Sequence, residues 1–211
     1  MRQFKWILIA LPILLFTACT TSKITSSWRD PATTKDLVSY KNILVVGMEG
    51  NRQVKEEMEN YMAEDLKKSG VNATASFDAF GPKAFVNLNE DQIADKVRSK
   101  GYDGVITIAL MDRKKEQNYV PGTVNYAPVG LFYNRFGRYY STIYSRIYDP
   151  GYYTTSTNYF WETNLYDARQ DKIIYSAQSQ SFDPSSLTSM SKEHGKLIIK
   201  DLQKSGFLAA K

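Results

Sequence analysis

The sequence predicts an α/β fold, with α+β as the alternative: a mixed sheet from a β-α-β-α-β half, followed by a β-hairpin and a C-terminal helix. First, short β-branched apolar runs alternate with amphipathic stretches between residues 42 and 111. Second, two segments of alternating polarity then flank a short polar turn, as in a hairpin. Third, the last long segment has apolar residues at helical spacing. We therefore expect a single domain over residues 42–211.

Residues 1–19 have the organisation of a secretion signal. A positive start precedes an apolar run at residues 6–16, which is too short to span a bilayer, and small residues then lead to Cys19, the only cysteine. This pattern resembles a bacterial lipoprotein signal, in which cleavage before the cysteine frees a thiol that receives a diacylglyceryl group. The usual pattern has Leu three residues before the cysteine, where this chain has Phe16. We predict a signal peptide at residues 1–18 and lipid attachment at Cys19.

Residues 19–41 are predicted to form a lipidated tether and a first strand. The stretch after Cys19 is rich in Ser and Thr, which is typical of a tether. Ile24, Ser26 and Trp28 alternate as in a strand. Trp28 is expected to dock this strand onto the core; the alternative is an aromatic side chain near the lipid headgroups.

The β-α-β-α-β half follows. Strands are predicted at residues 42–48, 71–77 and 104–111, and helices at residues 52–69 and 90–100. Asn89 and Gln92 have the spacing of a capping box before the second helix, and Gly70 and Gly101 follow the two helices. Because helical segments connect these strands, we expect right-handed crossovers and a mostly parallel arrangement here.

Residues 112–159 form an insertion with an unusual composition that includes most of the 15 tyrosines. Tyr and Arg provide rigid contact area and planar hydrogen-bond donors, the chemistry of protein interfaces and of stacking on sugars. The alternative is an extra hairpin packed on the body, and the two interpretations are compatible. The candidate binding residues are Tyr133, Arg135, Arg138, Tyr139, Tyr140 and Arg146.

The chain is predicted to end with strands at residues 158–167 and 172–182 and a helix at residues 186–204, closed by Gly206. His194, the only histidine, falls on the apolar stripe of this helix. A metal site would need a second ligand on that face, so we expect a histidine packed in the core.

Composition excludes several function classes. The formal net charge is +5, and it falls to +3 when Arg2 and Lys5 leave with the signal peptide. This mild, unclustered excess does not indicate a nucleic-acid partner. Once Cys19 carries lipid, no thiol remains for a disulfide, a metal or a nucleophile. Gly47 and Gly50 lack the spacing of a dinucleotide loop, and no cofactor is expected.

Glu49, Asp78 and Asp112 follow the three predicted parallel strands. If the carboxyl ends of these strands share one rim, the three acids could hold a hard cation, as in a cation-dependent hydrolase. Acids are also common at solvated strand ends, and we favour that explanation, with no metal and no enzymatic activity.

Several segments, in order, resemble a group of bacterial lipoproteins that share a domain of unknown function. They are Ser-x-Trp-x-Asp-Pro at 26–31, Lys-Asn-Ile-Leu-Val-Val at 41–46, Lys-Gly-Tyr-Asp-Gly-Val at 100–105, the Tyr-rich insertion, and Glu-x-Asn-Leu-Tyr-Asp at 162–167. The resemblance implies an envelope lipoprotein with one α/β domain and brings no catalytic residues. Thr20 is compatible with sorting to the outer membrane.

We therefore expect a membrane-anchored envelope lipoprotein that faces the periplasm and acts as a non-enzymatic binding or structural module. Its expected partners are the lipid bilayer, through Cys19, and an envelope protein or glycan, through the Tyr/Arg insertion.

Overall fold

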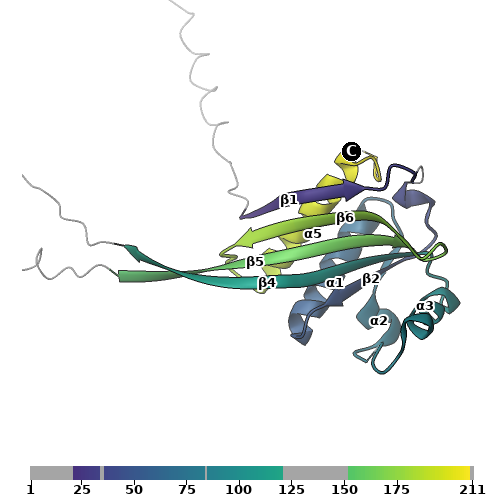
Figure 1. Ribbon diagram of the computed structural model, residues 1–211, viewed down its shortest axis with the longest axis horizontal. Coiled ribbons are helices and arrows are strands. Elements are labelled where there is room, and N and C mark those ends of the chain that lie inside the picture. The colour runs from purple at the N-terminus through teal and green to yellow at the C-terminus, as the bar shows by residue number, and fades with distance from the viewer. Residues whose placement is uncertain (1–20, 34–35, 84, 121–151, 210–211) are drawn as a thin grey trace, which may run out of the picture.

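The computed structural model describes residues 21–33, 36–83, 85–120 and 152–209 (Figure 1). The strands are β1 (Ser22–Arg29), β2 (Ile43–Met48), β3 (Ala73–Ala75), β4 (Gly104–Val120), β5 (Tyr152–Asp167) and β6 (Lys172–Phe182). The helices are the 3-10 turn η1 (Leu37–Ser39) and α1 (Arg52–Lys68), α2 (Ser76–Phe80), α3 (Glu90–Ser99) and α5 (Leu187–Lys204).

One mixed sheet organises the molecule. Its strand order is β1-β6-β5-β4-β2-β3. Strands β2, β3 and β4 run parallel, whereas β4, β5, β6 and β1 pair antiparallel with one another in turn. The predicted α/β fold with a mixed sheet is therefore confirmed.

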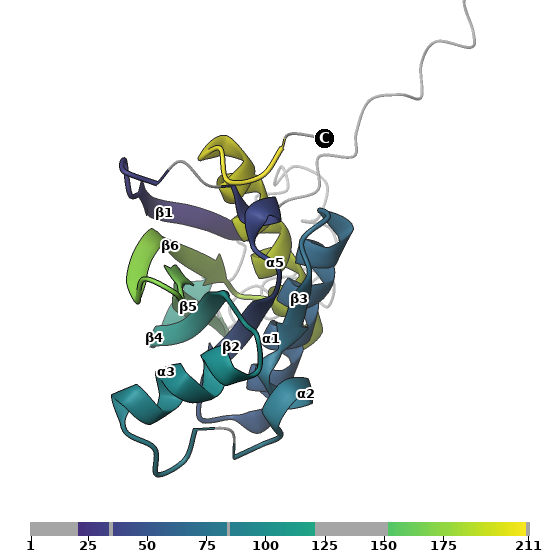
Figure 2. The ribbon, with the colours of Figure 1, turned by 90° about the vertical axis from the view of Figure 1, so that its right-hand side faces the viewer.

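Helices lie on both faces of the sheet. Figure 2 shows α1 and α5 together on one face and α3 across β2 on the other. Two right-handed crossovers explain this arrangement, because the chain leaves β2 for β3 in one direction and returns past β2 to β4 in the other. The main core lies between the sheet and the α1–α5 pair, and includes Ile43, Val45, Met62, Leu66, Ile106, Ile108, Trp161, Leu165, Ile198 and Leu202.

The predicted ends of β4 and β5 are wrong. The structure extends β4 from the predicted end at Met111 to Val120, and β5 begins at Tyr152 instead of Asn158. The added residues form a two-stranded ribbon that projects beyond the sheet (Figure 1), after a register shift between Leu110 and Asp112. Residues 111–119 are exposed. Since neither face of a solvated ribbon needs apolar residues, hydrophobic periodicity did not reveal these strands.

Two further expectations are corrected. The strand predicted at residues 71–77 is only Ala73–Ala75, because the chain turns at Ser76 into α2. The first strand is present as β1, but the indole of Trp28 is 47% exposed and does not dock on the core.

The helix ends follow the sequence closely. The Asn89–Gln92 capping box is present at the start of α3. Gly206 has φ 73°, and Phe207 folds back so that its amide donates to the Leu202 carbonyl at 2.9 Å. None of the helices within the described ranges is long and apolar enough to cross a membrane.

Candidate functional site

The sites predicted from sequence fall largely outside the described residues. This holds for Cys19 and for Tyr133, Arg135, Arg138, Tyr139, Tyr140 and Arg146. The described chain begins at Thr21, two positions after Cys19, and its first residues are hydrogen-bonded to the body. The hydroxyls of Thr21 and Ser22 donate to the Glu193 carboxylate on α5 at 2.8 and 3.1 Å.

The structure does not bring the three strand-end acids together. Asp112 lies within β4, where its carboxylate accepts from the Arg113 amide at 2.8 Å and lies 3.7 Å from the Lys114 ammonium. Asp78 lies in α2 and Glu49 follows β2. Among the described residues, no group of three or more His, Cys, Asp or Glu side chains could hold a metal. The three acids do not share one edge of the sheet, because β4 continues well past the end of β2.

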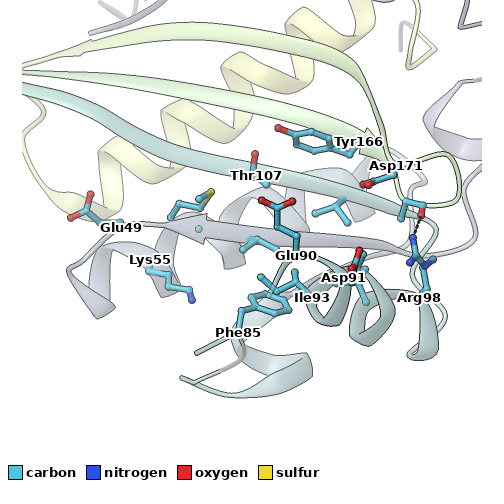
Figure 3. A pocket seen from close by; sticks show the side chains of 17 residues that line it. Glu49, Lys55, Phe85, Glu90, Asp91, Ile93, Arg98, Thr107, Tyr166 and Asp171 are labelled. Carbon is cyan, nitrogen blue, oxygen red and sulfur yellow. Dashed lines mark hydrogen bonds between the residues drawn. The ribbon is translucent and has the colours of Figure 1, made fainter. Parts of the chain in front are cut away.

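A groove of about 990 Å³ lies between α3 and the outer face of the sheet (Figure 3). Its apolar wall consists of Val46, Phe85, Ile93, Ala94, Val97, Val105 and Tyr166. Alternation along the strands places Val46, Val105 and Tyr166 on the face opposite the main core. The volume is in the range of small-ligand sites.

Carboxylates dominate the polar part of this groove. Glu90 and Asp91 come from the first turn of α3, where the helix dipole favours negative charge, and Asp171 comes from the β5–β6 turn. In Figure 3, Glu90 reaches toward Thr107 of the sheet. These three acids form no hydrogen bond or ion pair with other described residues. The groove therefore offers free acceptors beside an apolar wall, which suits a ligand with cationic and apolar parts.

The two basic residues of the groove already have partners. One Arg98 nitrogen contacts Asp95 at 2.8 Å and another donates to the Ala168 carbonyl at 3.4 Å. The Lys55 ammonium lies 3.9 Å from the buried carboxylate of Glu59. The free charge of the groove is therefore negative, in a chain whose formal net charge is positive.

Glu59 is a residue that sequence analysis missed. Its side chain is fully buried and accepts from the Gly47 amide at 2.8 Å, the Ser76 hydroxyl at 2.6 Å and the Phe77 amide at 2.8 Å. It thus joins the end of β2, helix α1 and the start of α2 next to the groove. The sequence did contain a sign that Glu59 is buried: it lies three residues before Met62, at the edge of the apolar stripe of α1.

His194 is a core histidine, as predicted. It is 1% exposed, its Nε2 lies 3.0 Å from the Thr163 hydroxyl, and its Nδ1 lies 3.3 Å from the Ser179 hydroxyl. Burial lowers the pKa of His194 to about 4, so the imidazole is neutral at pH 7. A neutral ring can donate to one hydroxyl and accept from the other, which suits a structural role.

Comparisons with known proteins give a likeness of fold. No family model and no curated protein matches the chain. The PelC dodecamer from Paraburkholderia phytofirmans is similar at 15% identity and TM-score 0.46, over 90% of this chain and 99% of that one. Lipoprotein GNA1162 from Neisseria meningitidis is similar at 13% identity and TM-score 0.42, over 77% of this chain and 98% of that one. A PDZ domain protein from Parabacteroides distasonis is similar at 10% identity and TM-score 0.43, over 91% of this chain and 38% of that one.

Proposed function

We propose that this chain is a lipid-anchored, non-enzymatic binding module of the bacterial envelope, located at the outer membrane and facing the periplasm. The observation that carries the proposal is the signal-like segment that ends at Cys19, the only cysteine. The acyl chains on this cysteine hold the body at the membrane by burial of hydrocarbon.

The attachment of the chain just after Cys19 supports this role. Thr21 and Ser22 are hydrogen-bonded to Glu193, and the Ser22 hydroxyl also donates to that of Ser181 at 3.0 Å. Only Thr20 separates the anchor from this bonded segment. An acyl group on Cys19 would therefore hold a folded body close to the leaflet, without a long flexible linker between them.

The anchor is tested by replacing Cys19 with Ser in the full chain and fractionating cells. We expect the natural chain in the membrane fraction, with lipid label and a mass that lacks residues 1–18. The Cys19→Ser chain should take up no lipid label and keep residues 1–18. Thr20→Ser is the matched control and should behave as the natural chain does. An unmodified thiol at Cys19 in the natural product would overturn the proposal.

Two features support the binding role: the Tyr- and Arg-rich composition of the insertion and the groove under α3. Cross-linking in intact cells, with and without glycan-degrading enzymes, identifies a protein or a glycan as the partner. Replacing Arg138, Tyr139 and Tyr140 with Ala tests the insertion, and Glu90→Gln with Asp91→Asn tests the groove. Loss of the partner with either set, in chains with unchanged melting temperature, is the expected result. Unchanged recovery with both sets would refute the binding role.

A further inference from the structure

The start of β1, three positions after Cys19, and the β4–β5 ribbon lie at the same end of the sheet. The strand pairing places Ser22, Ser181, Tyr159 and Arg113 in one row across β1, β6, β5 and β4. The chain enters this row from Cys19, and β4 leaves it to form the ribbon. Figure 1 shows the ribbon projecting from the end of the molecule where β1 begins.

Chain lengths determine how far each segment reaches from this row. Ser22 is three positions after Cys19, so a lipid on Cys19 would lie within roughly 10 Å of the row even if that stretch is fully extended. Strand β4 runs seven residues beyond Arg113 to Val120, about 23 Å at the usual rise per residue. A leaflet that holds acyl chains on Cys19 is therefore within reach of the ribbon.

The two faces of the ribbon differ in chemistry. One face carries Arg113, Lys115, Gln117 and Tyr119 opposite Tyr159, Thr157, Thr155 and Tyr153, and none of these eight residues is an acid. The other face carries both acids of this stretch, Asp112 and Glu116, with Lys114 between them. The first face is thus basic and aromatic, and the second carries one more acid than base.

The aromatic residues on the basic face are exposed to solvent. Tyr119 and Tyr153 are 55% and 71% exposed, and their ring centroids are 5.1 Å apart. Tyrosine is enriched where a bilayer meets water, since its ring and hydroxyl match the two sides of that boundary. Arg and Lys side chains are attracted to anionic headgroups. An isolated two-stranded ribbon is also only marginally stable in water, so contact with a surface would stabilise it.

We propose that the basic face of the ribbon, formed by Arg113, Lys115, Tyr119 and Tyr153, binds the anionic headgroups of the leaflet that holds the lipid anchor. This inference rests on the proposed anchor at Cys19. It adds a second membrane contact, which fixes the orientation of the body: the end of the sheet where β1 begins faces the bilayer.

The test uses the full lipoprotein reconstituted in vesicles of phosphatidylcholine and phosphatidylglycerol. Because acylation of Cys19 leaves no other thiol, a cysteine introduced by Gln117→Cys or by Asn118→Cys carries a fluorophore at one site. These adjacent positions lie on opposite faces of the ribbon. With nitroxide-labelled headgroups, we expect quenching at position 117 to exceed quenching at position 118 by about twofold or more.

A charge change completes the design. Arg113→Gln with Lys115→Gln, in the Gln117→Cys chain, should reduce quenching to the level of position 118, whereas Lys114→Gln should leave it unchanged. Equal quenching at positions 117 and 118, or quenching that the double change does not alter, overturns the inference while the anchor stands. Labelling of Cys19 itself, or failure of the protein to stay with the vesicles, instead overturns the proposed anchor.

Discussion

Replacement of Glu59 by Gln is expected to destabilise the junction between β2, α1 and α2. One carboxylate oxygen accepts from the Gly47 amide and the Ser76 hydroxyl, and the other accepts from the Phe77 amide. Glutamine has one acceptor oxygen and one NH2 group. Whichever way the amide is oriented, a donor faces at least one N–H or O–H donor in a site closed to water.

The size of the effect follows from these three bonds. With the amide oxygen toward Gly47 and Ser76, the Phe77 amide loses its acceptor, which costs about 1–3 kcal/mol when the group is buried. The two remaining bonds change from charge-assisted to neutral, which weakens each of them. We expect a total loss of about 3 kcal/mol in the free energy of unfolding, or roughly 6–12 °C in melting temperature for a domain of this size.

Denaturant unfolding measures the total, and amide hydrogen exchange locates it. Exchange at Gly47 and Phe77 should accelerate more than exchange at amides in the centre of β5. Glu56→Gln is the matched control: it removes an exposed ion pair with Arg52 on the same helix, which contributes at most about 0.5 kcal/mol. If Glu59→Gln and Glu56→Gln gave the same free energy of unfolding, the role assigned to the buried carboxylate would be refuted.

Two further changes test the core and the packing of α1. The pKa of His194 is lowered by burial from 6.5 to about 4, so the unfolded state takes up a proton first as the pH falls, and between pH 6.5 and 4 the fold loses up to about 3 kcal/mol on this account. Urea unfolding across this range should show a smaller loss for His194→Gln; an equal loss would contradict the assignment. Gly47→Ala places a Cβ 3.0 Å from Lys55 Cγ and 3.2 Å from the Lys55 carbonyl oxygen, and should cost about 1–2 kcal/mol in urea unfolding. Gly50→Ala, which meets open space, should change stability by less than about 0.5 kcal/mol, and equal effects would refute the packing argument.

The sequence was most informative where burial or capping constrains the residue type. The runs in β2 and at the start of β4 are apolar because both of their faces are covered. The Asn89–Gln92 pair identifies the start of α3 because only a few side chains can bond to free amides at a helix end. The left-handed conformation at Gly206 is likewise specific.

The sequence was least informative where a long-range contact determines the backbone. The chain turns into α2 at Ser76 because the Ser76 hydroxyl and the Phe77 amide bond to Glu59, a residue 17 positions before Ser76. No local pattern records this partnership. The ribbon is a similar case: its pairing of Arg113 with Tyr159 lies across a long insertion, and its polar residues resemble those of a loop.

The candidate site shows the same difference between features set by local sequence and features set by long-range contacts. The expectation that acids follow the parallel strands was useful for Glu49, which lines the groove. It was wrong for Asp112, since β4 gains an antiparallel partner and continues. Glu90, Asp91 and Asp171 depend on the position of α3 over the sheet, which no spacing in the sequence specifies.

The buried acids of this protein differ from the acids of the groove in their hydrogen bonding. Asp103 accepts from the Lys41 and Asn42 amides, and Asp201 accepts from the Tyr175 hydroxyl at 2.8 Å. Together with Glu59, these acids connect neighbouring segments of the chain, and their carboxylate oxygens accept hydrogen bonds from within the fold. Glu90, Asp91 and Asp171 have no such task among the described residues. Their removal should therefore leave stability nearly unchanged while it alters binding of a cationic partner, and this separation distinguishes a binding surface from a structural one.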